Sequence, residues 1–274
     1  MTINCKGQLI DLSSPKVMGI LNITPDSFYD GGKHKNEKEI LKHVEKMLFE
    51  GATFIDIGAY SSKPKADFVT EDEELSRILP IVTSVLKEFP NALLSIDTFR
   101  SQVAKQCINN GAALINDISA GKLDNNMLKT VADLHIPYIM MHMKGTPQTM
   151  QQLTQYDNLV KDILFYFSER IVEARQLGIV DIIVDPGFGF AKTLKQNYEL
   201  LNQLELFNML ELHLLVGVSR KSMIYKTLQN SANDALNGTT VLNTIALQKG
   251  ANILRVHDVK ETVECIKLVQ SLKA

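Results

Sequence analysis

The sequence predicts one α/β domain over residues 1–274, folded as a TIM-type (β/α)8 barrel with an N-terminal β-hairpin. Eight short apolar runs alternate along the chain with amphipathic helical stretches. Parallel strands need helical crossovers between them, and eight parallel strands close a barrel of about this length. A doubly wound open sheet is the alternative that this pattern leaves open.

The predicted elements follow in order from the N-terminus. Residues 1–13 differ from the rest and predict a hairpin that covers the N-terminal end of the barrel. The predicted strands are the apolar runs 17–23, 53–57, 93–96, 114–115, 138–141, 182–184, 214–218 and 253–256. The predicted helices include the stretches 37–49, 71–89, 159–177 and 239–249. In the stretch 159–177, apolar residues recur at a helical spacing at Ile163, Phe167, Ile171 and Ala174.

The composition excludes several classes of protein. Hydrophobic residues make up 45% and charged residues 22%, which is typical of a soluble globular protein. A net charge of −2 gives no electrostatic reason to expect binding to nucleic acid or to a membrane surface. No apolar stretch reaches the ~18 residues that span a bilayer, and the N-terminus lacks the pattern of a signal peptide. The three widely spaced cysteines, Cys5, Cys107 and Cys265, predict reduced thiols in a cytoplasmic protein.

Polar residues follow the predicted strands, where barrel enzymes gather their chemistry. Asp97, Asn116 and Asp185 form an acceptor-rich group. Carboxylates and amides can bind a flat heterocycle through paired hydrogen bonds. These residues therefore predict a site for a polar heterocycle at the floor of the barrel mouth.

A second group of residues near the end of the chain is cationic: Lys221, Arg255 and His257. The planar guanidinium of arginine suits phosphate oxygens. Because the last strand of a barrel closes against the first, Arg255 and His257 are expected near Asn22. We expect this group to bind an anion at the rim of the same site.

Plainer interpretations exist for single residues. Asp97 could cap a helix, and Arg255 with His257 could be an exposed pair on the last strand. His142, between two methionines, is interpreted as a structural histidine, and Asp56 and Asp117 as residues that cap or brace loops. Each signal is weak alone, but together they occur at the ends of at least seven strands, which favours a functional site.

These strand ends carry motifs that resemble, in order, those of the dihydropteroate synthases. The matching segments are residues 18–28, 55–58 with 61–64, 95–98, 115–117, 141–143 with 145–147, 185–190, 219–222 and 255–257. The match extends from about Val17 to the C-terminus. The second loop departs from the family pattern: Ser62 replaces a common threonine, Lys63 an arginine and Lys65 a glycine. These changes concern the geometry of the loop rather than the chemistry.

The resemblance implies an alkyl transfer that needs no protein nucleophile. The family displaces diphosphate from (7,8-dihydropterin-6-yl)methyl diphosphate with the amine of 4-aminobenzoate, a step of folate biosynthesis. The electron-rich pterin can stabilise positive charge at its methylene carbon, so the protein has to neutralise charge on the leaving diphosphate. The resemblance assigns this task to Mg²⁺, bound by Asn22, and to Lys221, Arg255 and His257.

The resemblance also assigns the residues that bind the substrates. The pterin would contact Asp97, Asn116, Met140, Asp185, Phe188 and Lys221. The diphosphate would contact Ser62, Arg255 and His257. The 4-aminobenzoate would lie among Asp26, Phe28, Pro64, Phe190 and Ser222, with its carboxylate at a helix N-terminus that begins with Ser222. The resemblance further implies a homodimer that is a target of sulfonamides, with small molecules as its substrates.

Two alternatives remain at the level of sequence. A corrinoid methyltransferase that uses methyltetrahydrofolate would share the acidic floor but would not need Asn22, Lys221, Arg255 and His257 together. A non-catalytic pterin-binding relative would be expected to have lost part of that set, and this chain has all of it.

Overall fold

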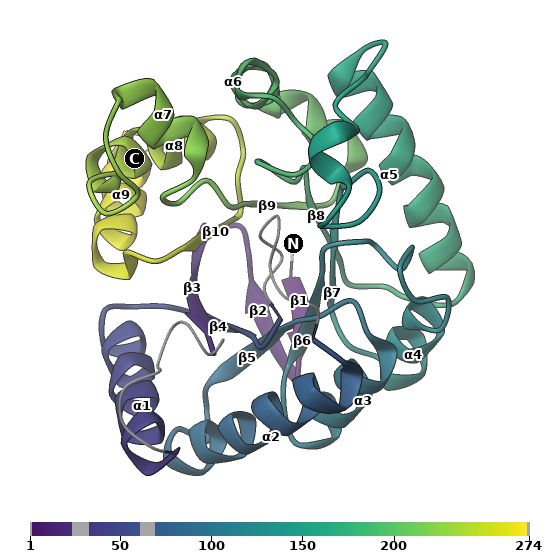
Figure 1. The fold of residues 1–274 in the computed structure, drawn as a ribbon, viewed down its shortest axis with the longest axis vertical. Helices are drawn as coiled ribbons and strands as arrows, with labels where there is room; N and C mark the ends of the chain where they lie inside the picture. The colour runs from purple at the N-terminus through teal and green to yellow at the C-terminus, as the bar shows by residue number, and fades with distance from the viewer. Residues whose placement is uncertain (1, 24–32, 61–68, 273–274) are drawn as a thin grey trace.

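The structure, a computed structural model, describes residues 2–23, 33–60 and 69–272 and forms the predicted closed barrel (Figure 1). Its eight parallel strands are β3 (Lys16–Asn22), β4 (Phe54–Gly58), β5 (Leu93–Asp97), β6 (Leu114–Asp117), β7 (Tyr138–Met141), β8 (Ile182–Asp185), β9 (His213–Val216) and β10 (Ile253–Val256). Strand β10 pairs with both β9 and β3, so the sheet has no edge and the open-sheet alternative is excluded.

The strands are apolar along nearly their whole length because both of their faces are buried. Strand β6 extends two residues beyond its apolar pair, through Asn116 and Asp117, which are polar but buried. The prediction, which relied on hydrophobicity alone, therefore ended β6 too early.

Helices surround the barrel (Figure 1). They are α1 (Lys33–Phe49), α2 (Glu71–Glu88), α3 (Ser101–Asn109), α4 (Met127–Leu134), α5 (Leu159–Gln176), α6 (Leu194–Asn202), α7 (Ser222–Leu228), α8 (Leu236–Gln248) and α9 (Val259–Ser271), with 3-10 turns η2 (Met150–Gln152) and η3 (Leu204–Leu210). The four predicted stretches are confirmed as helices, although α1 and α8 begin earlier than predicted. Helix α2 begins where expected because Thr70 caps it, accepting the Glu73 N–H at 3.2 Å.

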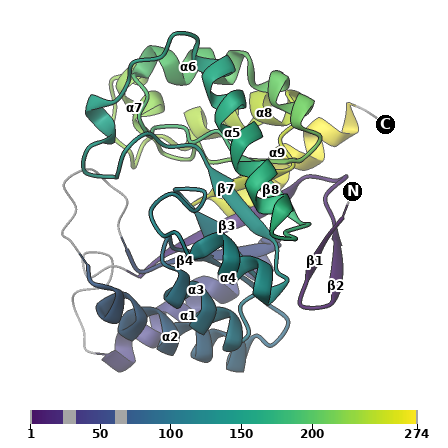
Figure 2. The ribbon, with the colours of Figure 1, turned by 90° about the vertical axis from the view of Figure 1, so that its right-hand side faces the viewer.

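The predicted N-terminal hairpin is confirmed as β1 (Thr2–Cys5) and β2 (Gln8–Asp11). Lys6 and Gly7 both have positive φ, as a two-residue hairpin turn of the primed type requires. The buried side chains of Ile3 and Ile10 pack with residues such as Phe54, at the start of a barrel strand. The hairpin therefore closes the N-terminal end of the barrel (Figure 2), and this leaves the carboxyl ends of the strands for the site.

The three cysteines are buried, unpaired thiols, as expected. Burial raises the pKa of the Cys5 and Cys107 thiols to about 12. The charge of Asp181 adds to this rise for Cys5, and the charge of Glu74 adds to it for Cys107. Both thiols are therefore protonated at neutral pH. Among the described residues, no helix combines the length and apolar character needed to cross a bilayer.

Candidate active site

Eleven of the predicted site residues lie at or just beyond the carboxyl ends of the barrel strands. They are Asn22, Asp97, Asn116, Met140, Asp185, Phe188, Phe190, Lys221, Ser222, Arg255 and His257. Four others, Asp26, Phe28, Ser62 and Pro64, lie outside the described residues. The structure thus provides the floor of the predicted site and the residues around β8, β9 and β10.

Arg255 lies within the acidic group, not apart from it. Its Nε donates to Asp56 Oδ2 at 2.6 Å and its Nη2 donates to Asp97 Oδ2 at 2.7 Å. Asn116 Nδ2 also donates to Asp56 Oδ2, at 3.1 Å. The predicted division into an acidic floor and a separate cationic rim is therefore wrong for Arg255, because buried carboxylates require a cation within contact distance.

Asp56 was expected to cap or brace a loop, and the structure corrects this. The residue lies in the middle of β4, fully buried, and forms part of the floor. Its Oδ1 atom has no hydrogen-bond partner within the described structure. A carboxylate inside the apolar run of β4 is a signal that could have identified Asp56 from the sequence, since such a group needs a partner.

One arginine between two carboxylates leaves an excess negative charge, which affects the titration of Asp97. Burial raises the pKa of Asp97 to about 7, the Arg255 charge opposes this rise, and the Asp56 charge adds to it. Burial tends to lower the pKa of Arg255, but Asp56 and Asp97 together raise it above its usual range. Arg255 is therefore always charged, and Asp97 can carry a proton near neutral pH.

Asp185 and Lys221 form a second part of the floor. Asp185 Oδ1 accepts the Gly187 N–H at 2.8 Å, whereas its Oδ2 makes no hydrogen bond to a described residue. Burial raises the pKa of Asp185, and the positive charge of Lys221 opposes this rise. Burial lowers the pKa of Lys221 to about 8, and the Asp185 charge limits this fall. Each group thus favours the charged form of the other.

The loop after β8 holds these groups in place. Gly187 has a φ of 73°, and a Cβ atom there would lie 2.1 Å from the His142 carbonyl oxygen, so only glycine fits. The Lys221 ammonium donates to the Phe188 carbonyl and lies 5.1 Å from the centre of the Phe190 ring. Ser222 begins the short helix α7, as predicted, and is half-buried beside them.

His257 is oriented by Ser219, a residue to which the sequence assigned no role. Ser219 Oγ accepts the His257 backbone N–H at 3.2 Å and lies 3.0 Å from His257 Nδ1. A hydroxyl that already accepts one hydrogen bond can donate its proton to Nδ1. In the neutral imidazole the proton then resides on Nε2.

Strand β10 pairs with β3, as expected from barrel closure, and Arg255 lies opposite Met18. Asn22 lies further along β3, opposite Gly58 of β4, and its side chain is exposed. Across the described residues, no hydrogen bond connects Asn22 with Arg255 or His257.

Lys192 is a buried residue of this region that the sequence did not identify. Its ammonium donates to the Gly187 carbonyl at 2.8 Å and the Phe190 carbonyl at 3.0 Å, and lies 3.1 Å from His142 Nδ1. Burial lowers the pKa of Lys192 to about 7, although the Asp185 charge opposes the fall. No sequence signal distinguishes this lysine from a surface one.

The interpretation of Asp117 as a residue that braces a loop agrees with the geometry. His142 is buried and contacts Lys192. Asp117 accepts hydrogen bonds from the backbone N–H groups of Ser119 and Gly121 and from the Tyr138 hydroxyl, so it braces the loop after β6.

Known proteins resemble this chain along nearly its whole length. The sequence profile of the family described as pterin binding enzymes matches residues 18–257. The dihydropteroate synthase of Escherichia coli strain K12 is 42% identical over 273 residues, which cover 99% of this chain and 96% of the relative.

Solved structures resemble the fold as closely. The Yersinia pestis dihydropteroate synthase in complex with a sulfonamide drug superposes with a TM-score of 0.93 at 43% identity, over 100% of this chain and 99% of that chain. The Xanthomonas albilineans dihydropteroate synthase with 4-aminobenzoic acid superposes with a TM-score of 0.92 at 36% identity, over 100% and 98%.

Proposed function

Because the chain belongs to the pterin-binding enzyme family, as one of its dihydropteroate synthases, we propose a distinct task for each residue at the mouth of its barrel. The enzyme is a transferase that condenses (7,8-dihydropterin-6-yl)methyl diphosphate with 4-aminobenzoate, giving 7,8-dihydropteroate and diphosphate. The observation that carries the proposal is the buried network of Asp56, Asp97, Asn116 and Arg255 beside Asp185 and Lys221.

The pterin is proposed to bind over this network. Asp185 Oδ2 is an acceptor without a partner in the described structure, suited to the 2-amino and ring N–H groups of the pterin. Lys221 can donate to a ring acceptor, while Asp97 and Asn116 bind another edge. Met140 and Phe188, both buried next to these polar groups, supply apolar contacts to the ring.

The diphosphate is proposed to bind Arg255, His257 and Ser62. Arg255 uses its Nε and Nη2 groups for Asp56 and Asp97, whereas its Nη1 makes no hydrogen bond to a described residue. Two N–H donors of Nη1 are therefore available for phosphate oxygens. In this way Arg255 can contact the acidic floor and the leaving group together. The contribution of Ser62 rests on the resemblance, since Ser62 lies outside the described residues.

A magnesium ion fits the donor set at Asn22. The exposed amide of Asn22 offers a hard oxygen ligand and makes no hydrogen bond within the described structure. Mg²⁺ usually takes one or two protein ligands, with waters and substrate phosphates completing its shell. The described residues contain no cluster of three or more His, Cys, Asp or Glu side chains that could hold a metal, so any such ion would rely on few protein ligands. When bound, the ion would neutralise charge on the diphosphate.

The proposed chemistry is the departure of diphosphate followed by capture of the pterin methylene by the amine. Arg255, Lys221 and the Nε2–H group of His257 stabilise the negative charge that grows on the leaving oxygen. No serine or cysteine nucleophile is needed. Asp97, Asp185 and Asn116 keep the pterin oriented so that its ring electrons can stabilise the methylene cation.

The 4-aminobenzoate is proposed to pack against Phe190, with its carboxylate near the Ser222 hydroxyl. Lys221, close to the Phe190 ring, adds positive charge on this side. Asp26, Phe28 and Pro64 complete the pocket in the proposal, and all three lie outside the described residues.

A coupled assay tests the function. The protein is mixed with the pterin diphosphate, Mg²⁺ and 4-aminobenzoate, and diphosphate and dihydropteroate are measured. Both products should appear in equal amounts, and Arg255→Ala should abolish most of the turnover. Methyl transfer from methyltetrahydrofolate to a corrinoid, without any dihydropteroate, would instead support the methyltransferase alternative.

A homodimer in the cytoplasm is the proposed state of the enzyme. Its buried, unpaired thiols suit a reducing compartment. Val241 of α8 and Leu268 of α9, on helices that pack together, expose half or more of their surface and could contribute to a subunit contact. Light scattering after size exclusion should give twice the 30.6 kDa chain mass.

A further inference from the structure

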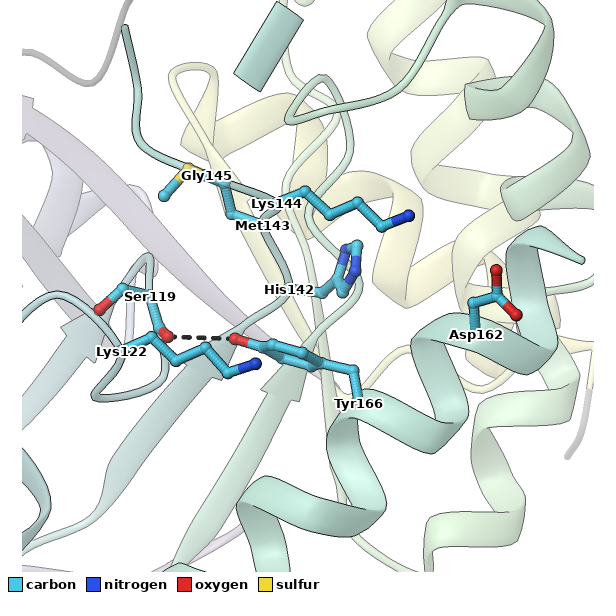
Figure 3. A pocket seen from close by; sticks show the side chains of 8 residues that line it. All are labelled: Ser119, Lys122, His142, Met143, Lys144, Gly145, Asp162 and Tyr166. Atoms are coloured by element: carbon cyan, nitrogen blue, oxygen red, sulfur yellow. Dashed lines mark hydrogen bonds between the residues drawn. The ribbon is translucent and has the colours of Figure 1, made fainter. Parts of the chain in front are cut away.

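A cavity of about 300 Å³ lies beside the site described above, between the loops after β6 and β7 and helix α5 (Figure 3). Its polar lining consists of Ser119, Lys122, His142, Lys144, Asp162 and Tyr166. None of these residues belongs to the proposed pterin, diphosphate or 4-aminobenzoate contacts. The cavity is therefore a separate feature of the molecule.

Aromatic rings and a backbone carbonyl lie against the ammonium groups of the two lysines in the lining. Lys122 Nζ lies 4.5 Å from the centre of the Tyr166 ring, and Lys144 Nζ lies 3.7 Å from that of Tyr156. Lys144 also donates to the Gln155 carbonyl at 2.6 Å. Neither lysine makes an ion pair within the described part of the chain. Aromatic faces and a carbonyl hold both ammonium groups in place without an ion pair, while the charges of Glu169 and Glu173 act on Lys122 from farther away.

His142 places a third donor between these lysines. Lys192 in its charged form has three N–H groups, and its three neighbours are the Gly187 carbonyl, the Phe190 carbonyl and His142 Nδ1. Nδ1 then accepts a hydrogen bond, so the imidazole carries its proton on Nε2. Nε2 makes no hydrogen bond to a described residue, and His142 lines the cavity (Figure 3).

Two further polar side chains of the lining make hydrogen bonds within the protein. Tyr166 donates its hydroxyl proton to the Ser119 and Met141 carbonyls. Asp162 is the only carboxylate of the lining, and its Oδ2 accepts the Asp157 N–H at 3.1 Å. With His142 neutral, two lysines and one aspartate give the residues of the lining a formal net charge of +1. Lys192, behind the ring, adds positive charge in its protonated form, and Glu169 and Glu173 act on Lys122 from outside the lining.

We propose that this cavity is a second anion site that binds a phosphate group, either inorganic phosphate or the phosphate of a small metabolite. Phosphate suits the cavity because its oxygens can accept from Lys122, Lys144 and His142 Nε2 at the same time. Burial, together with the charges of the neighbouring lysines, holds the pKa of His142 low, and burial lowers the pKa of Lys122. The negative charge of a bound anion opposes the lowering of both pKa values and favours the charged form of Lys192.

The site is connected to the catalytic floor by short contacts. His142 touches Lys192, and Lys192 binds the carbonyls of Gly187 and Phe190 in the loop that contains the proposed pterin ligands. Occupancy of the cavity should therefore change pterin affinity, and reciprocally, by a modest factor.

Calorimetry of inorganic phosphate tests the proposal. The enzyme is first saturated with the pterin diphosphate, so that the catalytic anion position is filled, and 4-aminobenzoate is omitted. Wild-type enzyme should bind one phosphate saturably, and Lys122→Gln/Lys144→Gln should weaken this binding roughly tenfold or more. The matched control, Lys105→Gln/Lys129→Gln, removes the same charge from exposed positions on α3 and α4 and should leave binding unchanged.

A second readout keeps the test specific to the cavity. The imidazole ¹⁵N shifts of His142 should move on phosphate addition in wild-type enzyme but not in Lys122→Gln/Lys144→Gln. Tighter binding of glycerol 3-phosphate than of phosphate would identify a metabolite phosphate as the ligand, and equal or weaker binding would identify the inorganic ion. Lack of saturable binding, or equal losses in both double variants, would overturn the proposal.

Discussion

Arg255 is the residue on which most of the site depends. It forms ion pairs with Asp56, which is fully buried, and with Asp97, which is mostly buried, and it retains donors for a phosphate group. A lysine offers one point charge and lacks the planar fork that contacts two carboxylates and an anion at once. The same side chain therefore stabilises the folded floor and serves the leaving group.

Arg255→Ala is predicted to destabilise the protein more at pH 8 than at pH 5.5. Removing the guanidinium raises the pKa of Asp97 further above its unfolded value, so the folded state favours the protonated carboxyl. Because the wild-type folded pKa of Asp97 is already about 7, the extra cost in the variant is absent below about pH 7 and grows as pH rises from there to the higher folded pKa of the variant. Breaking a buried pair costs ~3–5 kcal/mol, and this full cost is expected only at the higher pH.

Chemical denaturation of wild type and variant at both pH values measures this difference. Arg255→Lys, which keeps one charge, should lose less stability than Arg255→Ala at pH 8. A loss that is the same at both pH values would show that the two carboxylates do not depend on Arg255.

Asp185→Asn is predicted to weaken pterin binding while the fold is retained. An asparagine Oδ1 can still accept the Gly187 N–H, but an NH2 group replaces the oxygen that faces the pterin donors. A mismatch of this kind costs ~1–3 kcal/mol, or roughly 5- to 150-fold in affinity. Calorimetry with a pterin on variant protein of normal melting temperature checks the assignment, and an unchanged affinity would contradict it.

At the scale of single residues, the sequence identified the polar residues at strand ends, but it did not show which side chains contact one another across the barrel. Asp97 and Asp185 follow apolar runs, a local pattern. Arg255 and Asp56 are 199 positions apart, and no local pattern connects residues at that distance. Lys192 was missed for a different reason: its environment, and not its position in a motif, makes it unusual.

At the scale of elements, the loop between β8 and α6 controls the pterin floor. Gly187 turns the chain against the His142 carbonyl, Lys192 binds the loop from within, and Asn197 of α6 accepts the Gly189 N–H at 2.6 Å. Helix α6 starts directly after this loop with a capping box of Thr193 and Gln196. The hydrogen bonds of this short loop hold Asp185 in one orientation.

Lys192→Met is predicted to separate the positioning role of Lys192 from its effect on stability. The variant keeps the volume but leaves the Gly187 and Phe190 carbonyls without their donor, so KM for the pterin diphosphate should rise more than kcat falls. Lys192→Arg, which retains donors, should restore part of the lost affinity. A fall in kcat with an unchanged KM would contradict the positioning role.

The pH dependence of stability gives a second test of Lys192. Its folded pKa, about 7, lies below the unfolded value near 10.4, so the folded state releases a proton that the unfolded state keeps. Wild-type stability relative to Lys192→Met should therefore rise between pH 7 and pH 10. Denaturant midpoints of both proteins at pH 7 and pH 9 measure this change in relative stability. A difference in midpoint that is the same at both pH values would show that Lys192 does not titrate in this range.

At the scale of the whole molecule, closure of the barrel brings the two ends of the chain together. Periodicity predicted both the barrel and its hairpin because strand and helix patterns are local, whereas the exact helix starts depend on caps that periodicity does not detect. The pairing of β10 with β3 and of β3 with β4 places the diphosphate residues on three adjacent strands or the loops that follow them. Ligand binding at one of these strands can therefore affect the loops that follow the neighbouring strands.

Ordered binding is the prediction that follows from this arrangement, with 4-aminobenzoate binding only after the diphosphate and Mg²⁺. Asn22, the proposed metal ligand, precedes Asp26 and Phe28 by a few residues, and Ser62, a proposed diphosphate ligand, precedes Pro64 by two. Each proposed contact to the second substrate is thus covalently close to a contact of the first. The prediction is that anion binding completes the second pocket beside Phe190 and Ser222, because a ligand whose binding-competent state is rarely populated binds more weakly in proportion to that population. Calorimetry of 4-aminobenzoate, or of a sulfonamide, with and without diphosphate and Mg²⁺ measures the coupling.

Arg255→Ala should reduce this coupling, because the anion then binds poorly. Equal affinities under both conditions in wild-type enzyme would mean that the second pocket is preformed.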